Sequence, residues 1–174
     1  LPFLRGRTLK GLLAEECANI LYALELQGHA NMWYTAAHDM FGRPGSMTAD
    51  IGTMRVGDAR LPEPLVVAVK AVIAKGELRA EEALESLTAI RRQTSMNEYG
   101  APEKGSLRSM RVILPGTVFE ATLEFRGTPD ERTLGLLAAC LLAWRRTGTG
   151  RNRGRGRLRA HLLDSDGLDI TERY

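Results

Sequence analysis

The stretch Thr147–Arg157 reads TGTGRNRGRGR and alternates glycines with arginines. Glycine lacks a Cβ atom, so its backbone can approach a ligand closely and can turn through positive φ at little steric cost. Successive backbone N–H groups in such a loop can form a concave anion site, and arginine forks match phosphate oxygens in pairs. The stretch, which we call the glycine–arginine loop, therefore predicts a phosphate-binding loop.

The segments that flank this loop indicate how it is held. Leu134–Trp144 is an apolar run of helical length, and Arg155–Leu163 alternates in a way that predicts a strand with one basic face. A Gly/Arg tract can instead be a solvated tail that binds nucleic acid loosely. Because the tract is short and lies between two apolar segments, an ordered loop is the favoured alternative.

The composition points to a folded protein with a local basic patch. The chain has 174 residues, of which 44% are hydrophobic, and its formal net charge is +3. That average hides a local excess, because seven arginines and no acidic residue lie between Arg145 and Arg159. Local basic patches are typical of proteins that bind nucleic acid.

Other features bear on the compartment and exclude a membrane span. Cys17 and Cys140 show no zinc-like spacing, which favours a reducing, cytoplasmic setting and predicts no metal ligands here. The sequence has no apolar run of the roughly 18 residues that a membrane helix needs, so we expect no membrane partner.

A second basic segment lies near the start of the chain. Apolar residues recur at helical spacing from Leu9 to Leu24, and Thr8 is the predicted N-cap residue of this helix. Arg5, Arg7 and Lys10 crowd the beginning of the helix. A helix N-terminus favours anions, so cations there fit an external phosphate that docks on the exposed N–H groups. A solvated basic turn is an equally good alternative. The candidate RNA-binding residues are Arg5, Arg7, Lys10, Gly148, Gly150, Arg151, Asn152, Arg153, Gly154 and Arg155.

The middle of the chain is harder to interpret. Residues 29–45 have no clear period and are expected to be irregular, and residues 65–73 fit a helix or a strand. Residues 80–92 predict a helix, and residues 93–106 predict an exposed polar excursion. We therefore expect an insertion at about residues 62–106.

Order returns in the second half of the chain. Residues 107–125 predict two strands joined by a Pro115-Gly116 turn, and residues 131–146 predict a helix. With one strand expected upstream of Leu1, the order is β-α-β-(insertion)-β-α-β. The expected fold is a single α+β domain over residues 1–174, ferredoxin-like (RRM-like), with a large insertion.

Four segments resemble the RAMP-superfamily proteins of CRISPR-associated complexes. Pro2–Leu13 (PFLRGRTLKGLL) is similar to their IPGSSLKGALR segment, and Met40–Gly42 followed by Gly52–Ala59 resembles their LFG and GxLxVxDA motifs. Leu114–Phe119 (LPGTVF) resembles their PGTxF hairpin, and Gly148–Gly156 resembles their glycine-rich loop. The four segments occur in the family's order and span nearly the whole chain.

The resemblance is closest to the repeating backbone subunits of type III effector complexes, which act in antiviral defence. It implies a cytoplasmic ribonucleoprotein subunit that grips guide RNA phosphates, meets target RNA and contacts other subunits, including copies or paralogues of itself. It also implies a thumb-like hairpin, for which residues 93–106 are the candidate. The family's target-cleaving aspartate would precede Leu1, so this chain shows no catalytic residue. A divalent metal would serve target cleavage, but no identified residue binds a cofactor.

A metal-independent endoribonuclease that processes precursor guide RNA is the alternative. Such enzymes share the fold and the glycine-rich loop and use a histidine as general acid or base. His38, which stands beside Asp39, would then be the catalytic residue. A surface histidine without a catalytic role is the more common interpretation of such a position.

Overall fold

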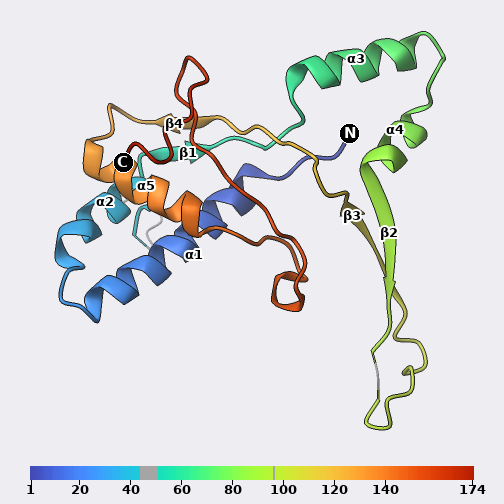
Figure 1. Ribbon diagram of the computed structural model, residues 1–174, viewed down its shortest axis with the longest axis horizontal. Helices are drawn as coiled ribbons and strands as arrows, with labels where there is room; N and C mark the ends of the chain where they lie inside the picture. The colour runs from blue at the N-terminus through green and yellow to red at the C-terminus, as the bar shows by residue number, and fades with distance from the viewer. Residues whose placement is uncertain (44–50, 96) are drawn as a thin grey trace. The chain divides into compact units, whose positions relative to one another are not determined.

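The computed structural model describes residues 1–43, 51–95 and 97–174 (Figure 1). The chain forms two compact units. We call Leu1–Leu4 with Ala59–Ala121 the hairpin unit, and Arg5–Asp58 with Thr122–Tyr174 the helical unit. Within the described residues, each unit contains an antiparallel pair of strands together with helices, so the expected α+β fold class is confirmed.

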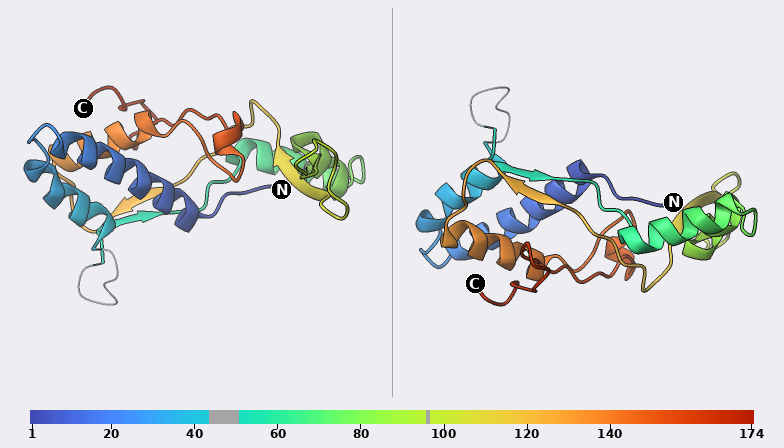
Figure 2. Two further views of the ribbon diagram at one scale, coloured as in Figure 1. Left: turned by 90° about the horizontal axis from the view of Figure 1, so that it is seen from below. Right: turned by 90° about the horizontal axis from the view of Figure 1, so that it is seen from above.

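The helical unit contains helices that pack against one another and against a short strand pair (Figures 1 and 2). Its main elements are α1 (Gly6–Glu25), α2 (Asn31–Phe41), α5 (Glu131–Ala143), β1 (Met54–Val56) and β4 (Leu123–Phe125). Strands β1 and β4 are antiparallel, and Arg55 lies opposite Glu124. The fully buried side chains of Met40, Met54, Leu137 and Cys140 form the centre of this unit.

Helix α1 follows from a simple apolar repeat. Leu9, Leu13, Cys17 and Leu21 recur every four residues, and all four are buried. Residues at this spacing share one helix face, which explains why the predicted helix is confirmed. The helix begins earlier than expected, however, because Arg5 rather than Thr8 is the N-cap residue.

Two features fix where α1 begins. The backbone N–H of Gly6 donates to Asp58 Oδ1 at 2.9 Å, so a carboxylate from the segment after β1 satisfies an N-terminal donor of the helix. A Cβ atom on Gly6 would overlap the carbonyl oxygen of Val56 and would lie 2.6 Å from that of Gly57. Only glycine therefore allows the start of α1 to lie this close to the end of β1.

Two expectations about the helical unit are wrong. Residues 31–41 of the segment expected to be irregular form α2, because Ala36, Ala37 and Met40 make a buried face. The small alanines conceal the helical period, which sequence reasoning usually recognises from large apolar residues. Arg155–Leu163 is not a continuous strand either. It forms only isolated bridges at Arg157 and Leu163 within the described residues, and its glycine at position 156 has positive φ.

In its described residues, the hairpin unit contains two helices and one strand pair. The elements are α3 (Glu63–Ala74), α4 (Ala80–Leu87), β2 (Thr88–Gln93) and β3 (Arg108–Ile113). The ambiguous segment at 65–73 is thus helical, and the strand predicted after residue 107 is confirmed. The Pro115-Gly116 turn is also present, with Gly116 at φ +81° and the Thr117 hydroxyl donating to the Leu114 carbonyl at 2.8 Å.

The helix predicted over residues 80–92 ends at Leu87, because the chain then continues as β2. The Thr88 hydroxyl donates to the carbonyl of Leu84 at 2.6 Å and accepts from Arg111 Nη1 at 2.9 Å. Thr88 and Ile90 are β-branched, a side-chain shape that favours strands. Cross-strand pairing with β3 therefore overrides the helical propensity of this segment.

The C-terminal segment of the helical unit is held by a carboxylate. Asp169 Oδ1 accepts from the hydroxyl and the backbone N–H of Thr171, at 2.6 and 2.9 Å, and Oδ2 lies 2.7 Å from His161 Nδ1. The Thr171 hydroxyl in turn accepts from the backbone N–H of Leu162 at 2.7 Å, and Thr171 is buried. The Thr171 hydrogen bonds, followed by His161, lower the pKa of Asp169 to about 2.

This network predicts an acid-sensitive stability. The pKa of Asp169 is lower in the folded state than in the unfolded state. Its carboxylate therefore contributes fully to the free energy of unfolding above the ordinary pKa of about 3.9. It is lost as the pH falls through about 2. We expect Asp169→Asn to lower the melting temperature at pH 7 and to flatten its decline below pH 4. Asp166→Asn is the matched control, because the Asp166 carboxylate has no hydrogen-bond partner among the described residues. Melting curves that decline in parallel for both variants would contradict the prediction.

Candidate nucleic-acid interface

The glycine–arginine loop is closed at its base by backbone pairing. The N–H of Thr147 donates to the carbonyl of Gly156 at 2.9 Å, the N–H of Leu158 donates to Arg145 at 3.1 Å, and Arg146 and Arg157 form a β-bridge. A short 3₁₀ helix, η1 (Arg151–Arg153), forms the tip. The structure thus has the ordered loop rather than the solvated tail (Figure 1).

Gly156 is the glycine that this closure requires. Its φ is +68°, and a Cβ atom there would overlap the carbonyl oxygen of Thr147. The three glycines proposed from the sequence are less crowded. Gly148 and Gly154 have positive φ in open space, and a Cβ atom on Gly150 would lie nearest to the flexible Arg155 side chain, at 3.2 Å. The sequence predicts that a ligand approaches the backbone closely at these three glycines. It gives no signal that Gly156 is the residue that closes the loop.

The arginines of the loop differ in what they contact. Arg151 Nη1 and Nη2 each lie 2.8 Å from a carboxylate oxygen of Glu15 on α1. This hydrogen bonding raises the pKa of Arg151 and lowers that of Glu15. Arg153 and Arg155 are exposed and have no ion-pair partner in the part of the chain that is described. The side chain of Asn152 is not among the parts of the chain that the structure describes.

The basic residues at the start of α1 also divide into two kinds. Arg5 and Arg7 are exposed, whereas Lys10 is half-buried and donates from Nζ to the carbonyl of Met54 at 2.7 Å. Burial lowers the pKa of Lys10, and the nearby charge of Arg126 lowers it further. Since Asp58 already occupies the Gly6 N–H, a phosphate docking here would depend on side chains more than on that donor.

A groove of about 580 Å³ is lined by residues of α1, α2 and β1. It is lined by Arg7, Lys10, Gly11, Ala14, Phe41, Met54, Arg55 and Val56. Cations beside an aromatic ring are the elements that single-stranded nucleic acid sites combine. Sequence reasoning missed Phe41 and Arg55 as lining residues, because only the fold brings α2 and β1 to the side of α1.

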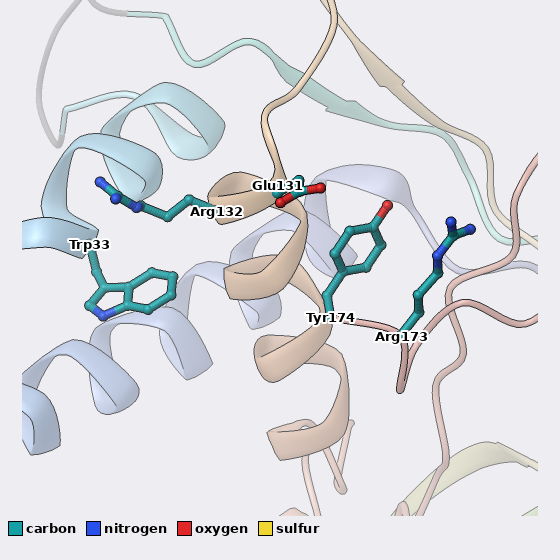
Figure 3. Close-up of a pocket in the computed structure, with 5 residues that line it drawn as sticks. All are labelled: Trp33, Glu131, Arg132, Arg173 and Tyr174. Carbon is teal, nitrogen blue, oxygen red and sulfur yellow. The ribbon is translucent and has the colours of Figure 1, made fainter.

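A second hollow lies at the start of α5 (Figure 3). It has a volume of about 420 Å³ and is lined by Trp33, Glu131, Arg132, Arg173 and Tyr174. Figure 3 shows that Arg132 extends toward the side of Trp33 and away from Tyr174 and Arg173. The side chains share no focal point, so we assign no ligand to this hollow.

The candidate catalytic histidine lies on α2, outside both the glycine–arginine loop and the set of residues that line the groove beside α1. His38 is exposed on α2, with its ring centroid 6.4 Å from that of Tyr34. Within residues 1–43, 51–95 and 97–174, it forms no ion pair. The same residues include no group of three or more histidine, cysteine or acidic side chains that could hold a metal ion, and none of their helices is long and apolar enough to cross a membrane.

A closed glycine–arginine loop and cationic side chains beside an aromatic ring, presented by one unit of an α+β protein, are features typical of proteins that bind nucleic acid. Residues 1–159 match the RAMP superfamily, and the chain belongs to this superfamily. Membership implies a CRISPR-associated RNA-binding function and a ferredoxin-like fold. A comparison with curated proteins found no match.

Proposed function

We propose that this chain is a guide-RNA-binding backbone subunit of a type III CRISPR effector complex. The observation that carries the proposal is the closed glycine–arginine loop, which presents Arg153 and Arg155 without ion-pair partners among the described residues. Arginines on an ordered loop bind phosphates at lower entropic cost than arginines on a disordered tail. The loop and the α1 groove occur in one compact unit of a RAMP-superfamily chain.

The proposed grip acts mainly on the RNA backbone. Affinity from phosphate contacts is salt-dependent and largely indifferent to base sequence. The proposed contact residues are those expected from the sequence, namely Arg5, Arg7, Lys10, Gly148, Gly150, Arg151, Asn152, Arg153, Gly154 and Arg155. Among them Lys10 and Arg151 are already hydrogen-bonded within the protein, so Arg153 and Arg155 are the strongest candidates.

The strand pair of the hairpin unit supports the thumb assignment. The pairing places Arg92 and Arg111 on one face of the β2–β3 ribbon, and Arg91 and Arg108 on the other. All four arginines are exposed. A two-stranded ribbon that is cationic on both faces fits insertion between nucleic acid strands, so we extend the proposed thumb from residues 93–106 to the whole hairpin.

Exposed apolar residues support a role as one subunit among several. Helix α3 is rich in valine and alanine but has no buried residue, and Leu65 and Val67 are 42% and 55% exposed. Exposed apolar patches mark interaction surfaces in many soluble proteins. We propose that other subunits of the complex, including copies or paralogues of this chain, contact the hairpin unit.

Binding, rather than cleavage, is the activity that we assign to these residues. Precursor processing by His38 would need neighbouring groups that bind or polarise the scissile phosphate. The described contacts of His38 include Tyr34 but no cation, so we do not advance that alternative.

A salt titration tests the proposed function. Two single-stranded RNAs of equal length and unrelated sequence are titrated with the protein, at salt concentrations between about 50 and 200 mM. We expect affinities that agree within about threefold, and a log–log salt slope of at least about 1.4 in magnitude, which corresponds to two or more phosphate contacts. A flat salt dependence, or an affinity that differs by tenfold or more between the RNAs, would contradict backbone recognition.

A further inference from the structure

The ion pair between Arg151 and Glu15 joins the tip of the glycine–arginine loop to α1. Both terminal guanidinium nitrogens, Nη1 and Nη2, are used, at 2.8 Å each, across 136 residues of sequence. Bidentate pairing of arginine with a carboxylate fixes orientation as well as distance. The pair therefore sets the direction in which the tip of the loop faces.

Hydrogen bonds from residues at the base of the glycine–arginine loop also hold its tip. Arg146 Nη1 donates to the carbonyl of Arg151 at 3.1 Å, and the indole N–H of Trp144 donates to the carbonyl of Arg146 at 3.1 Å. Trp144 is buried. A continuous series of contacts thus runs from the core through Trp144, Arg146 and Arg151 to Glu15 on α1.

We propose that Glu15 is a positioning residue, which holds Arg151 on α1 so that Arg153 and Arg155 are presented to RNA. This inference refines the proposed contact set: Arg151 anchors the loop through Glu15 instead of binding a phosphate itself. The inference rests on the proposed function of the loop, and it adds a role for an acidic residue in a basic surface.

The alternative is that Glu15 merely neutralises Arg151 and competes with RNA for it. The side chains of Arg151 and Glu15 are 37% and 47% exposed, so RNA could reach the pair. A phosphate that displaced Glu15 would exchange one bidentate partner for another and would release the loop from α1. Because an anchored loop loses less entropy when RNA binds, positioning is the favoured explanation.

The two explanations predict opposite effects for Glu15→Gln. Positioning predicts that RNA binding weakens by about fivefold, a coupling of ordinary size for residues in contact. Competition predicts tighter binding, since a negative charge is removed and Arg151 is released. Glu16→Gln is the matched control, because it removes the same charge from the neighbouring position and forms no ion pair in the described structure. An affinity of Glu15→Gln for RNA that equals or exceeds that of Glu16→Gln would overturn the proposal.

A charge swap supplies a second, independent readout. Arg151→Glu is expected to weaken binding, and the double variant Glu15→Arg with Arg151→Glu is expected to return within about threefold of the native affinity, because the tether is rebuilt. Arg151→Lys should bind as weakly as Glu15→Gln, since lysine keeps the charge but lacks the planar fork. A folded double variant that stays as weak as Arg151→Glu would show Arg151 to be a phosphate ligand. The native protein's salt slope is unaffected by this outcome, so the proposed function is judged separately.

Discussion

Gly6→Ala is expected to destabilise the helical unit by at least about 3 kcal/mol, at the upper end of the range for overpacked sites. The added methyl group would meet the carbonyl oxygens of Val56 and Gly57. Both neighbours are backbone atoms, so no side chain can move aside. The start of α1 would have to shift away from β1, and the hydrogen bond from the Gly6 N–H to Asp58 would be lost with it. Urea or thermal unfolding followed by circular dichroism measures the effect.

The matched control is Gly11→Ala in the same helix. A Cβ atom on Gly11 would have no neighbour within 4 Å, and the position is exposed. Replacing an exposed helical glycine by alanine reduces the entropy lost on folding, so this variant should be more stable by up to about 1 kcal/mol. Equal effects from the two substitutions would show that the approach of α1 to β1 does not decide the stability.

The elements that could be predicted are those whose large apolar residues repeat regularly. Leu9, Leu13 and Leu21 define α1, and the apolar run of α5 defines the helix before the loop. The alternation of side chains along Arg108–Ile113 predicts β3 correctly, because this strand pairs with β2. Periodicity is informative where burial follows it.

The elements that the sequence did not predict depend on packing and pairing with segments that are distant in the sequence. Helix α2 buries two alanines and one methionine, so its period is faint. Strand β2 follows a helix whose Glu-rich start and Arg91-Arg92 end suggested one longer helix with a favourable dipole. Arg155–Leu163 alternates without a strand to pair with along its described length. Tertiary pairing decides all three segments.

The same reasoning separates what was predictable in the candidate site. Glycine and arginine types predicted the loop, because their backbone freedom and charge are properties of single residues. The contacts that anchor it could not be predicted, since Glu15 lies 136 residues from Arg151 and Asp58 lies 52 residues from Gly6. Acidic residues in a basic surface are thus structural partners that composition alone does not reveal.

The double substitution Arg153→Ala with Arg155→Ala should weaken the binding of single-stranded RNA by about 100-fold. A hydrogen bond to a charged group contributes about 1.5–3 kcal/mol, so each arginine accounts for about tenfold or more. The weakening should be the same for RNAs of unrelated sequence. The log–log salt slope should fall in magnitude by about 1.4, because each lost phosphate contact removes about 0.7 for a single strand. Fluorescence anisotropy at several salt concentrations measures both quantities.

The control for this variant is Arg132→Ala with Arg173→Ala, which removes two exposed cations from the same unit at the hollow beside α5. Both double variants lower the net charge equally, so a general electrostatic attraction would weaken RNA binding equally in both. Site-specific contacts instead predict that the salt slope changes only when the loop arginines are removed. Melting temperatures should stay close to native in both variants, because exposed charges contribute little to stability. If the loop variant keeps the native affinity and salt slope, Arg153 and Arg155 do not grip RNA, and the observation that carries the proposed function is lost.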